Sequence, residues 1–406
     1  MGHSSLTKNP FGNATFRRWF SAETALSIGA ATSVAVPLLI IHVGGSVSTA
    51  GIIASVVAAA ELCAVWCCGF WADKYSRFRL LFSVVTVAAL SSIGVTIYSA
   101  LSHNSSLLIV SLLVLISAIS FAGAEPVNDA ALKSLITPEQ FPRATAAAQA
   151  RSSVLSLVGP SATGLVFSIA PWLPFLLRSL CALVFVGILR TIKDFLQPHA
   201  AEHNTGAKYR DALGFLFATP QLRRVLLATP FINFMYFAAV SWPVYFLPFN
   251  GYGSEHVGLV VSGFALGGLV GATIAPRLTD RFRSQQLITV GLLWQIVGCI
   301  LFMLSSGSLV WMVLSAAVMM VLSPALNAGL FTDVFALTPV NLQGRVMALF
   351  MIAGGFAAIA VPATISWLVL HSTPMISGLT MCMSGAVGWL IVAIKPRHSS
   401  QIDTSA

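Results

Sequence analysis

Residues 48–99, STAGIIASVVAAAELCAVWCCGFWADKYSRFRLLFSVVTVAALSSIGVTIYS, consist of two long apolar runs separated by a short basic gap. Lys74, Arg77 and Arg79 lie in this gap, whereas the next gap along the chain, 99–106, has no lysine or arginine. Each run is long enough to cross the hydrocarbon core of a bilayer, which takes about 20 apolar residues. The stretch therefore predicts two membrane-spanning helices joined on the cytoplasmic side, where positive charge accumulates.

The same alternation of gaps continues along the whole chain. All 22 lysines and arginines except Arg151 and Arg178 fall in every second gap or at the chain ends. The positive-inside rule assigns those gaps, and both termini, to the cytoplasmic side. We therefore expect a multi-pass protein of the cell membrane, plasma or inner, with both termini in the cytoplasm.

The apolar runs number twelve, and an even number agrees with both ends on one side. Lipid excludes unpaired backbone groups, so only helices and closed barrels cross it, and these runs are too long for barrel strands. We predict an all-α membrane protein with twelve transmembrane helices in two pseudo-symmetric six-helix bundles. The first bundle lies within 1–191, a cytoplasmic central loop covers 192–224, and the second bundle lies within 225–406 and ends in a short cytoplasmic tail. The approximate spans are 17–41, 48–71, 79–99, 107–131, 146–169, 172–191, 225–249, 255–276, 285–306, 309–331, 345–369 and 374–394.

Composition narrows the class of protein further. Charged residues make up 9% of the chain and apolar residues 57%, against about 25% and about 45–50% in soluble domains. The net charge of +9 is spread over short gaps, so no nucleic-acid partner is expected. The six cysteines lie in apolar runs without metal-ligand spacing, and no nucleotide loop or nucleophile constellation occurs. We expect neither an enzyme nor a cofactor nor a metal site.

The two halves of the sequence resemble each other. Residues 135–143, LITPEQFPR, correspond to residues 337–345, LTPVNLQGR, and a proline follows at the same distance in both halves, Pro160 and Pro362. An acidic residue and a basic residue also end the second span of each half, in 73–74 and in 280–281. These matches indicate a duplication, and parallel repeats of six spans are a known transporter plan.

The gap in residues 69–79, GFWADKYSRFR, resembles the signature loop of the major facilitator superfamily. The resemblance rests on a glycine, an acid four residues later and basic residues around the turn, and it implies a gate role for Gly69, Asp73, Lys74, Arg77 and Arg79. Phe78 departs from the pattern. In the second half the loop is degenerate, but it keeps Asp280 and Arg281.

A second motif is in span five, where Gly159, Pro160 and Gly164 resemble the core of the antiporter motif of drug exporters. A glycine-proline pair in a membrane helix is also often only a tolerated kink. With FRRW at 16–19, TPEQFPRA at 137–144 and LFATPQ at 216–221, the chain is similar to the macrolide and enterobactin exporter branch. This resemblance implies export of a bulky amphipathic small molecule by a protein that works as a monomer.

Six charged residues interrupt the apolar runs of the first half. An ionisable group at the centre of a membrane span costs at least about 2.5–3.5 kcal/mol, so each needs a reason. In the second half only Glu255 and Asp333 occur, both near span ends. The six are Glu23, Glu61, Glu125, Asp129, Arg151 and Arg178.

Glu61 is our first candidate for a proton carrier, because it lies near the middle of its span among alanines. The alternative is a permanent ion pair with Arg178 or Arg151 that only stabilises the bundle. Glu125 and Asp129 share a helix face and are further candidates, although a salt bridge at the cytoplasmic rim is the favoured explanation.

Glu23 is also a proton-coupling candidate, although snorkelling to the inner interface is the favoured explanation. Span four lacks the arginine and glutamine pattern typical of drug/proton antiporters, so coupled protons would have to use these first-half carboxyl groups. Arg178 needs Glu61, a helix carbonyl end or an anionic substrate as its partner.

Span seven is rich in aromatic residues, FINFMYF at 231–237 and WPVYF at 242–246, and we expect it to form the wall of a large apolar pocket. Asn233, Tyr236 and Trp242 are the candidates for orienting a ligand, although Trp242 also suits an interfacial belt. The predicted function is a secondary exporter that works by alternating access with proton antiport. Alternatives are a proton-coupled importer of a small metabolite and a membrane receptor that transports nothing.

Overall fold

The structure is a computed structural model that describes residues 10–101, 106–137, 139–192, 209–339 and 342–393. Within those ranges, the side chains of Asp73, Lys133, Ser134, Pro142, Tyr209 and Asp333 lie outside the described part. The sequence-based expectations for Asp73 and Asp333 therefore concern side chains that the structure does not describe.

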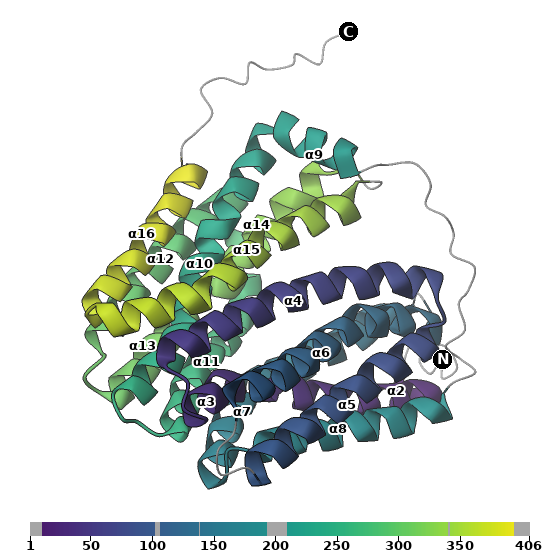
Figure 1. Ribbon diagram of the computed structural model, residues 1–406. Coiled ribbons are helices and arrows are strands. Elements are labelled where there is room, and N and C mark those ends of the chain that lie inside the picture. Colours follow the sequence, from purple (N-terminus) through teal and green to yellow (C-terminus); the bar gives the residue numbers. More distant parts are fainter. Residues whose placement is uncertain (1–9, 102–105, 138, 193–208, 340–341, 394–406) are drawn as a thin grey trace.

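The described chain folds into helices, twelve of which are long and apolar enough to span a membrane (Figure 1). The fold is thus the all-α, twelve-span fold predicted from the sequence. The helices of the first half are α2 (Ala14–Ala31), α3 (Ala35–His42), α4 (Val47–Lys74), α5 (Arg77–Leu101), α6 (Leu107–Leu135), α7 (Phe141–Ile169) and α8 (Leu173–Thr191). The remaining helices are α9 (Tyr209–Ala218), α10 (Pro220–Phe249), α11 (Ser254–Arg281), α12 (Ser284–Leu304), α13 (Leu309–Met320), α14 (Ser323–Leu337), α15 (Gln343–His371) and α16 (Pro374–Ala393).

Two of the spans are interrupted. The first consists of α2 and α3, joined by the 3₁₀ turn η2 (Thr32–Val34), and a second 3₁₀ turn, η1 (Pro10–Gly12), precedes α2. The hydroxyl of Thr32 donates to the carbonyl of Gly29 at the break. The tenth span consists of α13 and α14, and Pro324 stands in the first turn of α14, where a missing backbone N–H costs nothing. Periodicity and apolar length do not reveal such breaks.

The expected loop at 192–224 contains structure near its end. Helix α9 lies there, and α10 begins at Pro220 rather than at residue 225. Ala212 and Leu216 of α9 are fully buried against a small core formed with α10, α14 and α15. The helix is short and amphipathic, and for that reason a search for long apolar runs does not find it.

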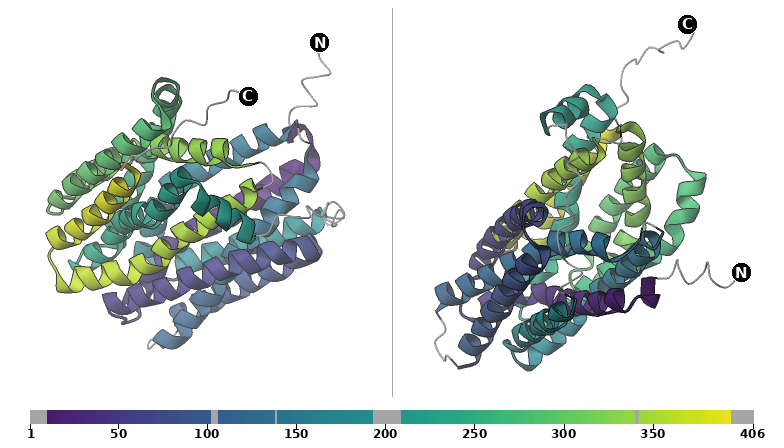
Figure 2. Two further views of the ribbon diagram at one scale, coloured as in Figure 1. Left: turned by 90° about the horizontal axis from the view of Figure 1, so that it is seen from above. Right: turned by 90° about the vertical axis from the view of Figure 1, so that its right-hand side faces the viewer.

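The two bundles share a core at one end of the molecule and have separate cores at the other (Figures 1 and 2). The shared core joins α3 and the start of α4 to α10, α11 and the end of α15. Toward the chain ends, Phe16 and Trp19 belong to a core made only from the first half. The two halves are therefore packed together at the end of the molecule where the 42–47 turn lies.

That turn is built by glycine and serine. Gly44 has a φ of 94°, a conformation that side-chain-bearing residues rarely adopt. The hydroxyl of Ser46 then accepts a hydrogen bond from the backbone N–H of Thr49 and caps α4. The turn places the start of α4 against the second half.

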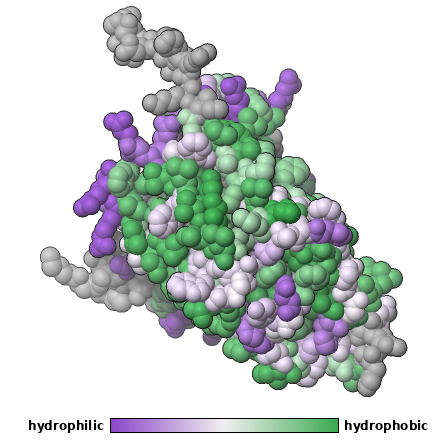
Figure 3. Space-filling model, turned by 90° about the vertical axis from the view of Figure 1, so that its left-hand side faces the viewer, coloured by the Kyte–Doolittle hydropathy of each residue, from purple (hydrophilic) through white to green (hydrophobic). Residues whose placement is uncertain are grey.

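Large apolar side chains cover much of the outside of the molecule. Leu90, Leu304, Trp311 and Phe356 are each more than half exposed. Figure 3 shows a broad apolar area on one face, with many hydrophilic groups toward its margins. A surface of this kind is stable in lipid, where helices pack by shape and not by hiding apolar groups from water.

Candidate functional site

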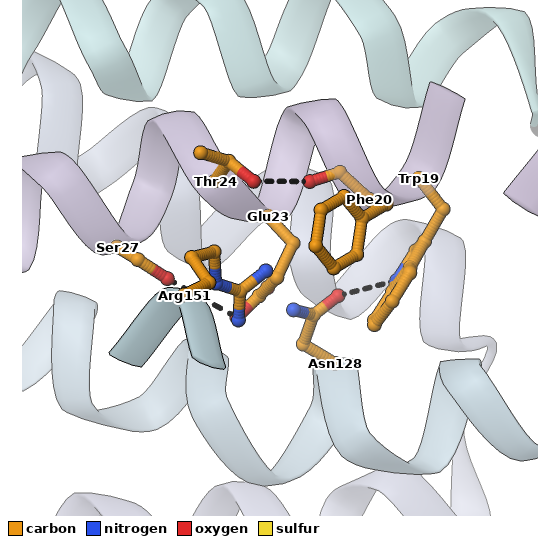
Figure 4. A network of polar contacts seen from close by, with 7 residues as sticks. All are labelled: Trp19, Phe20, Glu23, Thr24, Ser27, Asn128 and Arg151. Atoms are coloured by element: carbon orange, nitrogen blue, oxygen red, sulfur yellow. Dashed lines mark hydrogen bonds and ion pairs between the residues drawn. The ribbon is translucent and has the colours of Figure 1, made fainter. Parts of the chain in front are cut away.

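Glu23 of α2 and Arg151 of α7 form an ion pair inside the first bundle (Figure 4). Nη2 of Arg151 lies 3.0 Å from Oε1 of Glu23, and the two side chains are 10% and 17% exposed. Glu23 therefore does not reach the interface by snorkelling, as the sequence favoured, because its nearest charge partner lies on α7.

The pair is incompletely satisfied. Oε2 of Glu23 and Nε and Nη1 of Arg151 are buried and hydrogen-bond to none of the described residues. Ser27 donates to Oε1 of Glu23 at 3.4 Å, and the guanidinium of Arg151 lies 5.2 Å from the ring centre of Phe20. Buried charges need additional hydrogen bonds to offset their desolvation, so this pair is held less firmly than a fully bonded one.

Asn128 of α6 lies beside this pair in Figure 4. Nε1 of Trp19 donates to Oδ1 of Asn128 at 2.8 Å, and both side chains are buried. The hydrogen bond fixes α2 against α6 and so positions Glu23 next to the acidic face of α6.

Arg178 of α8 is almost fully buried, and its partners are not carboxylates. Its guanidinium lies 3.9 Å from the ring centre of Phe121, and its Nε donates to the hydroxyl of Ser117 at 3.1 Å. The charge of Glu61 acts on it through space, but among the described residues the two do not form an ion pair within 4.0 Å. Of the alternatives open from the sequence, a permanent Glu61–Arg178 bridge is absent in this conformation, and Arg151 is occupied by Glu23.

Glu125 and Asp129 link Glu23 and Glu61 electrostatically. Both are exposed on the same face of α6. The charge of Glu125 acts on Glu61, and the charges of both acids act on Glu23. The structure thus brings the six intramembrane charges into one electrostatically connected group, which we call the charge cluster: Glu23, Glu61, Glu125, Asp129, Arg151 and Arg178.

A cavity of about 560 Å³ lies in the second half, lined by α10, α12, α14 and α15. Phenylalanine, methionine, leucine, valine and isoleucine side chains make up most of its wall. Its polar side chains are Thr229, Asn233, Tyr236, Gln295, Ser323 and Asn327. The size is within the usual range for small-molecule sites, about 300–1,000 Å³.

The three span-seven candidates have different positions. Asn233 and Tyr236 line the cavity. Trp242 does not: it is fully buried, stacked on Phe246 at 3.9 Å between ring centres and packed edge-on against Phe302. This excludes both expected roles for Trp242, the cavity wall and the interfacial belt, because the shared core of the two bundles encloses its ring.

The sequence analysis did not predict several of the residues that line the cavity. Gln295 and Asn327 stand in the apolar stretches LLWQIVG and PALNAGL of spans nine and ten. A lone amide in an apolar run is the signal that could have found them, since a polar group in a span needs a partner.

The halves contact each other through glycine-lined interfaces. A Cβ atom on Gly164 of α7 would meet the backbone of Ser254, and one on Gly258 of α11 would meet the carbonyl of Pro160. Gly159 faces Ala31, whose Cβ would be 2.9 Å away from an added Cβ. The antiporter-like residues 159–164 thus permit close approach of α7 to α11 and to the break in the first span.

The signature-loop residues lie at the opposite end of the spans. Gly69 faces Pro126 of α6, at 3.8 Å from an added Cβ, and the ammonium of Lys74 lies 4.1 Å from the ring centre of Phe70. Arg77 is half-buried, while the other gate candidates with described side chains, Arg79, Asp280 and Arg281, are exposed. The contacts of Gly69 with Pro126 and of Lys74 with Phe70 both lie within the first half.

Comparison with known proteins agrees with this architecture. The sequence profile described as Major Facilitator Superfamily matches residues 20–362 and 243–405. The chain belongs to this superfamily, and it is a multi-pass membrane transporter. None of the curated proteins compared with the chain matches it.

Solved structures of transporters share the fold at low sequence identity. A bacterial homologue of the iron transporter ferroportin, in an inward-facing state, superposes with a TM-score of 0.71 at 14% identity and covers 94% of this chain and 99% of its own. A D-xylose–proton symporter gives 0.69 at 15% identity, with coverage of 92% and 95%. A nucleoside transporter gives 0.69 at 12% identity, with coverage of 93% and 99%.

Proposed function

We propose that the chain is a secondary exporter that moves a bulky amphipathic small molecule out of the cell by alternating access, in exchange for protons. The observation that carries the proposal is the charge cluster inside the first bundle. Four carboxyl groups there face two guanidinium groups, so the cluster has excess negative charge when all six are ionised. Intramembrane carboxyl groups of this kind are typical of proton relays.

The closed end between the bundles supports alternating access. By the positive-inside rule the chain ends face the cytoplasm, so this conformation opens inward and is closed outside. Rocking of the two bundles around the central region would open the other side. The resemblance of residues 159–164 to an antiporter motif favours export over import.

Glu61 is the residue through which we propose that proton binding is sensed. It is half-buried on α4, within electrostatic range of both Arg178 and Glu125. Protonation of Glu61 would remove its attraction for Arg178 and its repulsion of Glu125, which changes how α4 and α6 fit together.

Efflux assays test the proposal. Compounds released by cells with and without the protein identify a transported compound, and everted vesicles then measure its uptake when a proton gradient is imposed. We expect gradient-driven uptake in everted vesicles, and loss of the gradient dependence in Glu61→Gln.

Glu139→Gln provides the matched control. Glu139 lies in an exposed loop outside the spans, where a hydrogen bond from the Thr137 hydroxyl lowers the pKa of its carboxyl group, so the same substitution there should leave transport unchanged. Accumulation inside intact cells would show an importer instead. Unchanged gradient dependence in Glu61→Gln would remove Glu61 from the mechanism.

A further inference from the structure

The cavity and the charge cluster lie in different halves of the molecule. Every described residue that lines the cavity comes from α10, α12, α14 or α15, and none of them is charged. The six charges of the cluster all lie on α2, α4, α6, α7 and α8. Whatever binds in the cavity is therefore surrounded by apolar groups and neutral hydrogen-bonding groups.

Asn233 presents an acceptor to the cavity. Its Nδ2 donates to the backbone carbonyl of Thr229 at 3.0 Å, which fixes the orientation of the amide. The hydrogen bond from Nδ2 is the only one that the Asn233 side chain makes to the described residues, so Oδ1 accepts none from them. Since Nδ2 is bonded to the carbonyl of Thr229 in the same helix, Oδ1 remains able to accept a hydrogen bond from a ligand.

Tyr236 and Gln295 supply further polar atoms near Asn233. Tyr236 is close to one turn further along α10, so it lies on the same helix face as Asn233, and its hydroxyl makes no hydrogen bond within the described part of the chain. Gln295, on α12, is 2% exposed, and its Oε1 also has no partner among the described residues. A buried amide oxygen without a partner loses its hydration without compensation, and such groups in native proteins call for an explanation.

We propose that this cavity binds an uncharged amphipathic solute, whose neutral polar group is held by Asn233, Tyr236 and Gln295 while its apolar body packs on the phenylalanines and methionines. This proposal deepens, and rests on, the exporter function proposed above. An ion would lose its hydration in the cavity without gaining a counter-charge, and that loss amounts to several kcal/mol. The solute is therefore neutral, and the charges that respond to protons are kept out of its site.

The two sites are in mechanical contact. Gly355 lines the cavity, and a Cβ atom on it would lie 2.8 Å from Cδ2 of Leu62. Leu62 directly follows Glu61 of the charge cluster on α4. A change in the position of α4 is thus transmitted to the cavity wall through packing, and the substrate needs no charge of its own to be coupled.

Equilibrium binding to the purified full-length protein in lipid nanodiscs tests the proposal. The neutral probe is estradiol, and estradiol dimethyl ether is the matched probe without hydroxyl groups. Tetraphenylphosphonium is the cationic probe and 8-anilinonaphthalene-1-sulfonate is the anionic one, with empty nanodiscs as the blank. We expect estradiol to bind about tenfold more tightly than its dimethyl ether, the difference expected for one polar contact of about 1.4 kcal/mol. The two ions should bind more weakly still, because they also lose their hydration without gaining a counter-charge.

Variants locate the site. Gln295→Leu and Asn233→Leu should each weaken estradiol binding about tenfold, while Gln285→Leu, the same change at an exposed position of α12, should not. Gln295→Glu has nearly the shape of the original side chain and should add tetraphenylphosphonium binding that the original protein lacks. This gain does not depend on estradiol resembling the natural substrate.

The outcomes separate this inference from the exporter function. Preference for either ion, or estradiol binding that survives both leucine substitutions, would overturn the neutral site. No binding of any probe, together with no gain of cation binding in Gln295→Glu, would overturn it too. Neutral-probe binding at Gln295 in a protein that shows no gradient-driven transport would support this inference and refute the exporter function alone.

Discussion

The backbone N–H of Ala363 in α15 donates a hydrogen bond to the hydroxyl of Ser55 in α4 at 3.0 Å, across the boundary between the two halves. Its counterpart in the duplicated arrangement joins α7 to α11, where the hydroxyl of Ser161 lies 2.9 Å from that of Ser262. Both contacts lie beside a proline inside a helix, Pro362 and Pro160 respectively. The two hydrogen bonds hold the closed end of the molecule together.

Removing the first of these hydrogen bonds should open the closed end. In Ser55→Ala, the N–H of Ala363 loses its acceptor only in the present conformation, at a cost of about 1–3 kcal/mol. We expect about a fivefold or larger shift toward the alternative conformation, measured from distances between spin labels on α4 and α15. Ser83→Ala, which removes a hydroxyl bonded only within α5, is the control. Identical distance distributions would contradict the role of Ser55.

Close approach of α11 to α7 should depend on Gly258. The backbone of Pro160 and Ser161 leaves no room for a Cβ atom there, so Gly258→Ala should separate the two helices. Gly268→Ala is the matched control in α11, because no atom lies within 4 Å of its added Cβ. We expect crosslinking between α7 and α11 to fall in the first variant and to stay unchanged in the second. Equal crosslinking in both would show that the interface tolerates a methyl group.

Removing one member of the Glu23–Arg151 pair should destabilise the protein more than replacing both members. Glu23→Gln or Arg151→Met alone leaves a buried charge without its partner, which typically costs about 3–5 kcal/mol. The double variant should recover much of the lost stability but not gradient-driven transport. Thermal unfolding in detergent, compared with Glu139→Gln as a surface control, measures the first effect. A double variant as unstable as the sum of the single variants would show that the two residues act independently.

The contribution of Arg178 to protein stability should depend on its contact with the ring of Phe121. Lysine at this position keeps the charge but loses the planar contact with Phe121 and the hydrogen bond to Ser117, so Arg178→Lys should destabilise the protein by about 1–3 kcal/mol. A double-mutant cycle with Phe121→Leu isolates the cation–π part. Strict additivity of the two substitutions would show that the guanidinium gains nothing from the ring.

The proposed orientation predicts which exposed positions react with a reagent added outside the cell. Gly307 and Gly214 are both exposed and have room for a side chain. After replacement of the native cysteines, Gly307→Cys should react with a membrane-impermeant maleimide in intact cells, and Gly214→Cys only after permeabilisation. The reverse pattern would invert the topology and with it the direction of opening.

The sequence predicted the spans well because apolar length and loop charge are properties of single segments. The breaks at Thr32 and before Ser323 were missed because apolar length does not reveal them. The helix at 209–218 was missed because it is short and amphipathic. Several predicted spans were also shorter than the helices, as for α4, which continues to Lys74. Polar ends of helices do not show in an apolar run.

For the candidate site, sequence singled out the unusual residues but not their partners. The cost of an ionisable group in lipid pointed to Glu23 and Arg151 separately, yet only the fold shows that α2 and α7 place them 3.0 Å apart. Trp242 was assigned to a surface or a pocket because an aromatic residue suits both, while the fold encloses it. Gln295 was overlooked because an amide is less conspicuous than a charge.

The separation of the cavity from the charge cluster also bears on how such a protein changes over evolutionary time. In the function proposed above, substitutions among Asn233, Gln295 and their neighbours should alter which solute is accepted without touching Glu23, Glu61 or Arg151. Substrate recognition would then belong to one copy of the duplicated unit and proton coupling to the other. Under the same proposal, exchanging the second copy for that of a relative should transfer a substrate preference and leave proton coupling unchanged.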